Sequence, residues 1–588
     1  MSEEGDIGLY NLARKSSSSY DTPRKRNPRR LSIVSVLHEE AKTPVKSPSN
    51  PSLVPSSPKI TKALSRSNSL PRLSRTESVS GSRSDDLQSF AFSSFPDSPQ
   101  LDSGSYIHSY RIRQPSSLAQ SDDAHERYCS QDGFIYGFSH FTQRRDSTSK
   151  RGYQQRSVVI LTQHPYPSLF YSIMSYLGRS FLSHGGPMLE VACHNIANWS
   201  DPQLGAALEL GFLGYVFTVE LPTSLDAQQS SKALRSPEKY DPESHASLVE
   251  ILASLSPQDP PIIDPFEAAI SHIWSIWECI LLCEPVLVFG PSAAVTSQVI
   301  WWLRDLLRPI PLTGDFRPFF TIHDVDNVTL LNARQPQAGL LLGVTNPFFE
   351  KKCSHWPHIL SLGSPKRQII HTTSNVILAA NSDVYRKGKT SSHALEISVG
   401  PSPGWTTKTH KRYISKDQAL LKKLEDSFRG DEHSRQRASE ALREHLTSRT
   451  AAFLMPLQRY LNTLIPTFAD RTAPTTPNLS THDVSTAPHP TLLPPTTHRP
   501  LNQLTVSVAT PALPLRLKPF SESSFFASLK VNGSPLPFKS TAKRKEFYER
   551  WLRTRAFGIW LAAQEEVVDK VLATPFPSAV SVKSSLGS

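Results

Sequence analysis

FFTIHDVDNVTLLNARQPQAGLLLGVTNPFFEKKCSHWPHIL, residues 319–360, is the stretch that decides the fold of this chain. It is dense in apolar and aromatic residues, and proline and glycine interrupt it at several points. Such a pattern predicts short buried strands separated by turns. The stretch holds no recognisable set of catalytic residues, so it points to a protein that works by binding another protein.

Around this stretch the sequence alternates between helical and strand-like segments. FEAAISHIWSIWECILLCE (266–284) and residues 292–307 have the spacing of helices. The predicted strands are PVLVFG (285–290), FFTIHD (319–324), GLLLGVT (339–345) and HILSLG (358–363). Strands that alternate with helices favour a mostly parallel sheet covered on both faces, and therefore the α/β class.

A first α/β module precedes this one and begins near Phe90. PSLFYSIMSYLGRSFL (167–182) reads as an amphipathic helix. The strands predicted around it are YIHSYRIR (106–113), DGFIYGFSHF (132–141), SVVILTQ (157–163) and YVFTVELP (215–222).

The C-terminal part of the chain changes to helical spacing from Lys416 onward. A Thr/Pro-rich spacer then separates it from a last aromatic helical piece that holds Trp551 and Trp560. We therefore divide the chain into a disordered Ser/Pro/Arg-rich arm (1–89), the first module (90–223), a linker (224–262), the central α/β module (263–405), a helical part (406–468), a disordered insert (469–517), a C-terminal helical piece (518–574) and a tail (575–588).

The composition argues against several classes of protein. The 588 residues carry a net charge of +12, but half of that excess lies in residues 1–89, where 15 Lys/Arg stand against 9 Asp/Glu. Basic residues there alternate with serine and proline rather than with stacking aromatics, so a nucleic-acid surface is not expected. No apolar run is long enough to cross a bilayer, and five cysteines make no disulfide framework. We expect a soluble protein of a reducing compartment.

Two cysteines, Cys279 and Cys283, are four residues apart and could share one face of a helix. Without histidine partners nearby in the sequence, such a pair is far more often core packing than a metal site. No metal ligand is therefore assigned.

The arm carries three candidate phosphorylation sites, Ser32, Ser69 and Ser78, each three residues after an arginine. RSNSLP (66–71) fits the pattern of a phosphoserine ligand for a 14-3-3-type adaptor, because phosphate would add about two negative charges there. A Ser/Arg-rich spacer that matches by chance is an equally good explanation.

Several catalytic patterns fail on inspection. GKT (388–390) lacks the earlier glycine of a phosphate loop, since that position is Asp383. HGGP (184–187) has no nucleophile elbow to accompany it and reads as a surface turn. His323 and Asp324 could form an acid/base pair, but neighbours on a strand point to opposite faces, which favours structural or interface roles. No catalytic residue and no cofactor is assigned.

Taken together, these segments resemble DENN domain-containing proteins, specifically subfamily six. The segments that carry the resemblance to its central block and helical C-terminus are WECILLCEPVLVFGPS (277–292), DFRPFFTIHD (315–324), LLGVTNPFF (341–349), HWPHIL (355–360) and MPLQRYL (455–461). Those similar to its N-terminal longin-like lobe are SFPDS (94–98), DGFIYG (132–137), KRGYQQRSVVILTQHPY (150–166) and LEVACHNIANW (189–199). The resemblance covers residues 90–574 apart from two inserts.

The resemblance implies guanine-nucleotide exchange on a Rab-type small GTPase, at recycling endosomes for subfamily six. Membrane association would then come through the GTPase at most, from the cytoplasm. A non-catalytic Rab-binding trafficking scaffold and a phosphoserine-regulated adaptor are the alternatives.

One departure concerns the start of the longin-like lobe. In the family an apolar strand pair precedes the segment that matches SFPDS, and here the Ser/Arg-rich arm stands in that place. Three explanations stay open: a missing coding segment, poor substitution by LSIVSVL (31–37), or an incomplete lobe. Because the family clamps its GTPase between two lobes, the exchange activity depends on which of these three explanations is right.

The candidate GTPase-binding residues are polar residues at strand ends of the central module, where open α/β sheets present binding surfaces. They are Asp315, Arg317, His323, Asp324, Thr345 and Asn346. For Asp315 and Arg317 the alternative is a local ion pair that holds the DFRP turn. For Thr345 and Asn346 it is turn chemistry ahead of Pro347.

Overall fold

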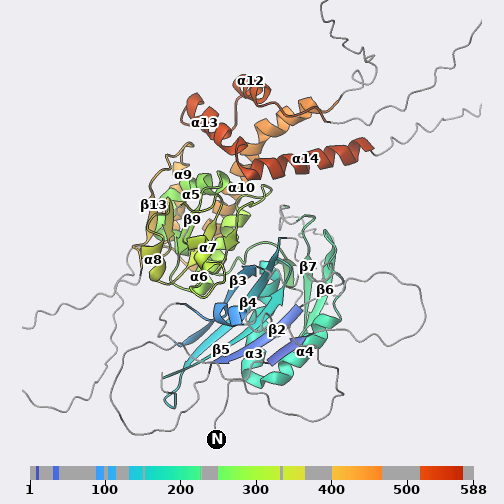
Figure 1. Ribbon diagram of the computed structural model, residues 1–588, viewed down its shortest axis with the longest axis vertical. Helices are drawn as coiled ribbons and strands as arrows, with labels where there is room; N and C mark the ends of the chain where they lie inside the picture. The colour runs from blue at the N-terminus through green and yellow to red at the C-terminus, as the bar shows by residue number, and fades with distance from the viewer. Residues whose placement is uncertain are drawn as a thin grey trace, which may run out of the picture. The chain divides into compact units, whose positions relative to one another are not determined.

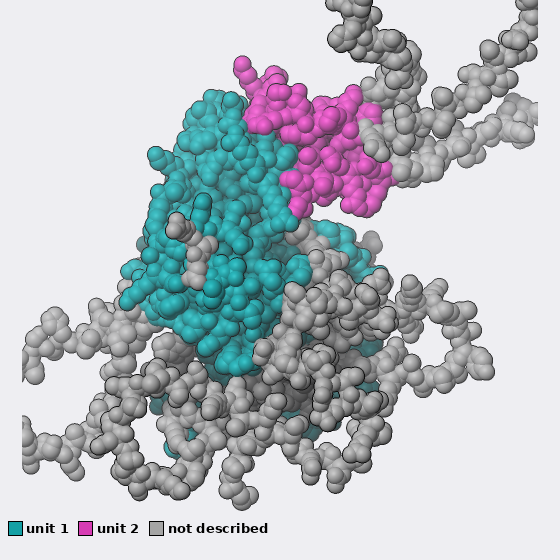
Figure 2. Space-filling view, in the orientation of Figure 1, with its two compact units in different colours: residues 1–450, 537–557 teal, residues 451–536, 558–588 magenta. Residues whose placement is uncertain are grey.

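In the computed structural model the chain forms two compact units, which are described separately (Figures 1 and 2). Unit 1 comprises residues 1–450 and 537–557, and unit 2 comprises 451–536 and 558–588. Residues that the structure describes are 8–11, 31–38, 88–97, 103–113, 132–149, 152–224, 227, 249–331, 335–364, 400–466 and 517–573. The predicted insert at 469–517 and the tail at 575–588 lie outside them, except for Leu517.

A five-stranded antiparallel sheet forms the core of the first module, in the order β1-β2-β5-β4-β3. Its strands are β1 (Gly8–Asn11), β2 (Leu31–His38), β3 (Gly104–Arg113), β4 (Phe134–Arg145) and β5 (Tyr153–Thr162). Helices α3 (Pro167–His184) and α4 (Gly186–Ala197) follow, and α3 packs on this sheet (Figure 1). HGGP is the junction of these two helices, where Gly185 has a φ of 69°.

The expectation of a disordered arm is wrong at β1 and β2. These strands pair with each other, and β2 pairs with β5 over its whole length. LSIVSVL therefore does supply a strand, because its apolar and β-branched residues suit a sheet. A strand pair stands where the sequence indicated a gap.

A small sheet follows in the order β6-β7-β8. Its strands are β6 (Ala207–Phe212), β7 (Tyr215–Glu220) and β8 (Val249–Leu252). β8 lies inside the predicted 224–262 linker and pairs in parallel with β7. The linker prediction is therefore wrong at its C-terminal end, where VEIL, a short strand with three apolar residues, follows a polar stretch.

The central module is built on a second five-stranded sheet, ordered β10-β11-β9-β12-β13. Its strands are β9 (Val286–Phe289), β10 (Phe316–Arg317), β11 (Leu341–Val344), β12 (His358–Ser361) and β13 (Gly404–Thr407). All pairs are parallel except β12 with β13. The predicted, mostly parallel α/β sheet is confirmed, although β13 extends two residues past the expected boundary at residue 405.

One predicted strand of this sheet is misplaced. FFTIHD is not a strand, because β10 ends at Arg317 and Pro318, which has no N–H, follows it. Phe320 donates one backbone hydrogen bond to Gly343, and the chain then turns through Thr321–Asp324. The aromatic pair that suggested a strand instead fills the core.

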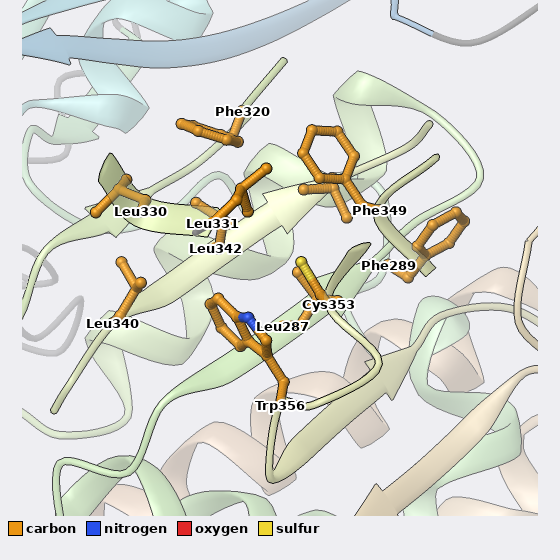
Figure 3. Packing of buried hydrophobic residues seen from close by; sticks show 11 residues of the cluster. Leu287, Phe289, Phe320, Leu330, Leu331, Leu340, Leu342, Phe349, Cys353 and Trp356 are labelled. Atoms are coloured by element: carbon orange, nitrogen blue, oxygen red, sulfur yellow. The ribbon is translucent and has the colours of Figure 1, made fainter. Parts of the chain in front are cut away.

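Helices on either side of the central sheet bury its strands. They are η3 (Asp264–His272), α5 (Ile273–Leu281), α6 (Ala293–Asp305), α7 (Asn327–Leu331) and α8 (Phe348–Lys352). Figure 3 shows the apolar cluster on one face of the sheet, in which Phe320, Phe349 and Trp356 surround the strand residues Leu287 and Leu342. The 319–360 stretch thus supplies most of this cluster.

A fully buried carboxylate anchors the chain that follows the central sheet. Glu278 of α5 accepts backbone hydrogen bonds from Tyr413 and Ile414 and a side-chain bond from His410 at 2.8 Å. Helices α9 (Gln418–Ser427) and α10 (Glu432–Leu464) come next, and α13 (Thr541–Leu552) returns to unit 1.

Unit 2 contains the end of α10, helix α12 (Glu522–Asn532) and most of α14 (Arg555–Ala573). Its aromatic residues Tyr460, Phe520 and Phe525 contact one another. Ser521 caps α12 by accepting from the amide of Ser524. Among the helices described here, none is long and apolar enough to cross a membrane.

Candidate protein-interaction site

The candidate site is built around Arg317, whose side chain is completely buried. Its guanidinium group forms a two-pronged ion pair with Asp315, with both nitrogen–oxygen distances at 2.9 Å. It also contacts Asp324 at 3.4 Å and Asp326. Three carboxylates around one guanidinium group make a rigid polar centre at the end of β10.

The carboxylates around Arg317 differ in pKa. Burial acts to raise the pKa of Asp315, but the guanidinium groups of Arg111 and Arg317 outweigh it and hold the pKa below its usual value. Burial raises the pKa of Asp324 to about 6, because Arg317 is a more distant partner and Asp326 adds a like charge.

Arg111 joins this centre from β3 of the first module. Its guanidinium group contacts Asp315 at 2.8 Å and Asp132 at 3.2 Å. It also lies 3.8 Å from the ring centre of Phe134 and 3.7 Å from that of Phe316. Asp315 therefore bridges two arginines that come from different lobes of unit 1.

An exposed apolar patch lies beside this polar centre. Its members are large hydrophobic residues with at least 40% of their surface exposed: Phe92, Ile322, Val325, Val328 and Phe348, here named the junction patch. Phe92 comes from the helical turn at residues 88–93, while Val328 and Phe348 belong to α7 and α8. Exposed apolar groups held on several elements are typical of a protein-interaction surface.

Ring stacking and polar contacts hold three members of the junction patch, Phe92, Ile322 and Phe348, in place. The ring of Phe92 stacks on His323 with centroids 4.6 Å apart. Asp97 accepts from the amide of Ile322 at 3.0 Å and from the side chain of Asn346 at 3.2 Å. Asn346 in turn accepts from the amide of Phe348 at 2.9 Å. Two segments more than 200 residues apart in the sequence therefore share one surface.

Asp97 is a partly buried member of this arrangement. Burial raises its pKa above the usual value, although the hydrogen bonds from Ile322 and Asn346 and the nearby His323 act in the opposite direction. The cost of burying the carboxylate is thus only partly offset.

The predicted site residues divide into two groups. Arg317, Asp324 and Thr345 are buried, so their side chains do not face a partner, and the carboxylate of half-buried Asp315 is occupied by Arg111 and Arg317. The alternative interpretation of Asp315 and Arg317, a local ion pair at the DFRP turn, describes their geometry. His323 is exposed and Asn346 half-buried, and both lie at the junction patch.

Phe92 and Asp97 were not among the residues predicted from the sequence. A signal was available, because both flank or belong to the SFPDS segment used for the resemblance, but nothing in the sequence places that segment against 322–348. Among the phosphorylation candidates, Ser32 lies on β2 and Ser69 and Ser78 lie outside the described residues, as does GKT.

Comparison with known proteins gives the chain its relatives. A scan against protein-family models finds no match. Human Protein DENND6B is 32% identical over 389 residues, which cover 64% of this chain and 63% of the relative. This chain is a homologue of the DENND6 proteins.

Other DENND6 proteins agree with this assignment. Mouse Protein DENND6A is 30% identical over 386 residues, covering 63% of this chain and 60% of the relative. The Dictyostelium discoideum Protein DENND6 homolog is 29% identical over 439 residues, covering 65% and 58%. The chain thus spans less than two thirds of the length of the DENND6 relatives it matches.

Proposed function

We propose that this chain is a guanine-nucleotide exchange factor that promotes GDP release from a Rab-type small GTPase. The observation that carries the proposal is the junction patch, an exposed apolar surface assembled from both lobes of a DENND6 homologue. The switch regions of the GTPase are the part that docks there.

Exchange by this route requires no acid, base or metal on the exchange factor. A partner that binds the nucleotide-free GTPase better than the GDP-bound form must lower the affinity of the GTPase for GDP by the same factor. A preference of about 5.5 kcal/mol for the nucleotide-free form corresponds to an affinity for GDP that is about 10⁴-fold lower. The rigid centre of Arg317 and Asp315 supports such a role, because a surface that remodels its partner must itself resist deformation.

The structure of the first lobe favours exchange over the alternative of a non-catalytic scaffold. That alternative was a loss of exchange through an incomplete first lobe, and the pairing of β1 with β2 and of β2 with β5 supports a complete sheet there. We place the activity at recycling endosomes, with the chain recruited through its GTPase, and expect a tagged chain to leave these membranes when its Rab is depleted. Capture by a 14-3-3-type adaptor through Ser69 is a separate proposal, and an unchanged pull-down with Ser69→Ala would contradict it.

The decisive experiment measures release of fluorescent GDP from a panel of purified Rab proteins by the full-length chain. We expect acceleration for at least one Rab and a loss of about 30-fold or more with Val328→Asp, as for an apolar side chain that is replaced by a charge within an interface. Val191→Asp is the matched control, because Val191 on α4 is also exposed but lies outside the junction patch. No acceleration for any Rab at micromolar concentration, or equal loss in both variants, would refute the proposal.

A further inference from the structure

Three side chains of metal-binding type meet at one end of the central sheet: Cys279 of α5, Glu284 just after it and His358 of β12. Their sulfur, oxygen and nitrogen atoms all lie within 4.8 Å of one another. The sequence offered Cys279 only Cys283 as a partner. The fold instead provides a histidine and a carboxylate, which was the missing condition for a metal site.

His358 is held in the orientation that a ligand needs. Its Nδ1 lies 2.9 Å from the hydroxyl of Thr407, and its ring stacks on Trp405 with the planes only 9° apart. Nε2 is thereby directed at Glu284. A histidine that bonds a neighbour through one nitrogen and presents the other is the usual arrangement around protein-bound metals.

Glu284 is held in a comparable way. One of its oxygens accepts from Arg550 of α13, and the other faces His358. The pair with Arg550 leaves the second oxygen in a fixed position. Cys279 is fully buried and His358 almost so, whereas Glu284 is only partly covered, so Glu284 marks the solvent side of the cluster.

The charges around the cluster suit a divalent cation. Glu278 precedes Cys279 in the sequence and adds a second, fully buried carboxylate. Two carboxylates and one thiolate carry three negative charges, while Arg550 supplies one positive charge. A divalent ion would make the local sum zero.

We propose that Cys279, Glu284 and His358 bind a divalent transition-metal ion of the zinc class. Zinc prefers thiolate, imidazole and carboxylate ligands, whereas calcium and magnesium prefer oxygen alone. A water molecule completes a tetrahedral set. On binding, the Cys279 thiol loses its proton to solvent, and Nδ1–H of His358 donates to Thr407 so that the Nε2 lone pair meets the metal.

The site would be structural in effect. It joins α5 to β12 directly and, through the shared carboxylate of Glu284, fixes the position of Arg550 on α13. Metal binding would therefore stabilise the packing of this C-terminal helix on the central module.

The test uses the full-length chain purified without chelators. Elemental analysis should find about one zinc ion per chain. After replacement by cobalt, a thiolate-to-cobalt charge-transfer band should appear, and Cys279→Ser and His358→Gln should abolish it. Thr407→Val should keep the band but weaken metal affinity by about 10- to 100-fold, as loss of a ligand's supporting hydrogen bond does.

Cys353→Ser is the matched control, because Cys353 is equally buried but packs in the apolar cluster of Figure 3. It should leave the cobalt spectrum unchanged. Less than stoichiometric metal together with no cobalt band in the unmodified chain overturns the proposal, even if every variant unfolds. So does a band that survives in Cys279→Ser.

Discussion

Asp315 and Asp324 contact the same buried guanidinium group, that of Arg317, yet their pKa values shift in opposite directions. Asp315 has two arginine partners at 2.8–2.9 Å, which overcome the effect of burial. Asp324 has one arginine partner, Arg317 at 3.4 Å, which does not overcome the effect of burial. The centre therefore holds one carboxylate that stabilises the fold when ionised and one that is costly to ionise.

We predict that Asp324 makes the chain more stable at mildly acidic pH. Its folded-state pKa of about 6 lies above the ordinary value of 3.8, so the folded state binds a proton between these values and this contribution is lost as pH rises through 6. Asp324→Asn should therefore reduce the stability gained between pH 7 and pH 5 by about 1 kcal/mol. Chemical denaturation of both proteins at the two pH values measures the difference, and equal slopes would contradict it.

Asp315→Asn should behave differently. The low pKa of Asp315 means that its contribution is complete at neutral pH and is lost only as pH falls below its ordinary value. Its removal at pH 7 leaves Arg111 and Arg317 without their shared partner and should cost about 3–5 kcal/mol. A loss no larger than that of Asp324→Asn in the same denaturation series would show that Asp315 is not the main anchor.

A third prediction concerns the buried carboxylate of Glu278. Glu278→Ala removes an acceptor from two backbone amides and from His410, and these donors would stay buried without a partner. We expect a loss of about 3–5 kcal/mol in the free energy of unfolding. Glu278→Gln keeps one oxygen acceptor and should lose less. If both variants unfold at the same denaturant concentration as the unmodified chain, the anchor has no energetic role.

Gly343 should not tolerate a side chain. A Cβ atom there would lie 2.4 Å from the carbonyl oxygen of Pro318, and backbone cannot easily move aside. Gly343→Ala should thus lower stability by about 2 kcal/mol or more. Gly558→Ala is the control, since its Cβ would meet nothing within 4 Å and alanine favours a helix such as α14 by about 1 kcal/mol. Thermal unfolding of both variants should therefore shift in opposite directions.

Asp97 is predicted to position the junction patch rather than to bind the partner itself. Asp97→Ala removes the link between Ile322 and Asn346, so the patch should lose its fixed shape. We expect GTPase affinity and GDP release to fall about tenfold, with little change in circular dichroism. Asp146→Ala removes a comparable aspartate turn with Thr148 and should leave both activities unchanged. An affinity equal to that of the unmodified chain would show that the link is dispensable.

Several strands of the two α/β modules were accessible from the sequence because each contains a run of mostly apolar residues. PVLVFG and HILSLG carry this signal without ambiguity, and both are strands. FFTIHD also has an apolar start but is not a strand, because Pro318 before it has no N–H to donate to a neighbouring strand. Local composition thus failed where one residue controls the backbone.

The site was less accessible for a different reason. Asp315 and Arg317 are only two residues apart, so the sequence alone suggested that they could form an ion pair. Arg111 contacts Asp315 and Asp97 contacts Ile322, although each pair is more than 200 residues apart in the sequence. A local sequence pattern cannot predict such contacts. The same holds for Cys279 and His358, which come together only because β9 and β12 are neighbours in the sheet.

The pairing of β2 with β5 has a practical consequence for any shortened form of this protein. A chain that started after residue 80 would lose two of five strands and leave β5 with an open edge prone to association with other chains. Deletion of the arm would therefore remove the phosphorylation candidates and damage the first lobe at once. Serine-to-alanine changes, which leave the strands in place, are the way to separate regulation from folding.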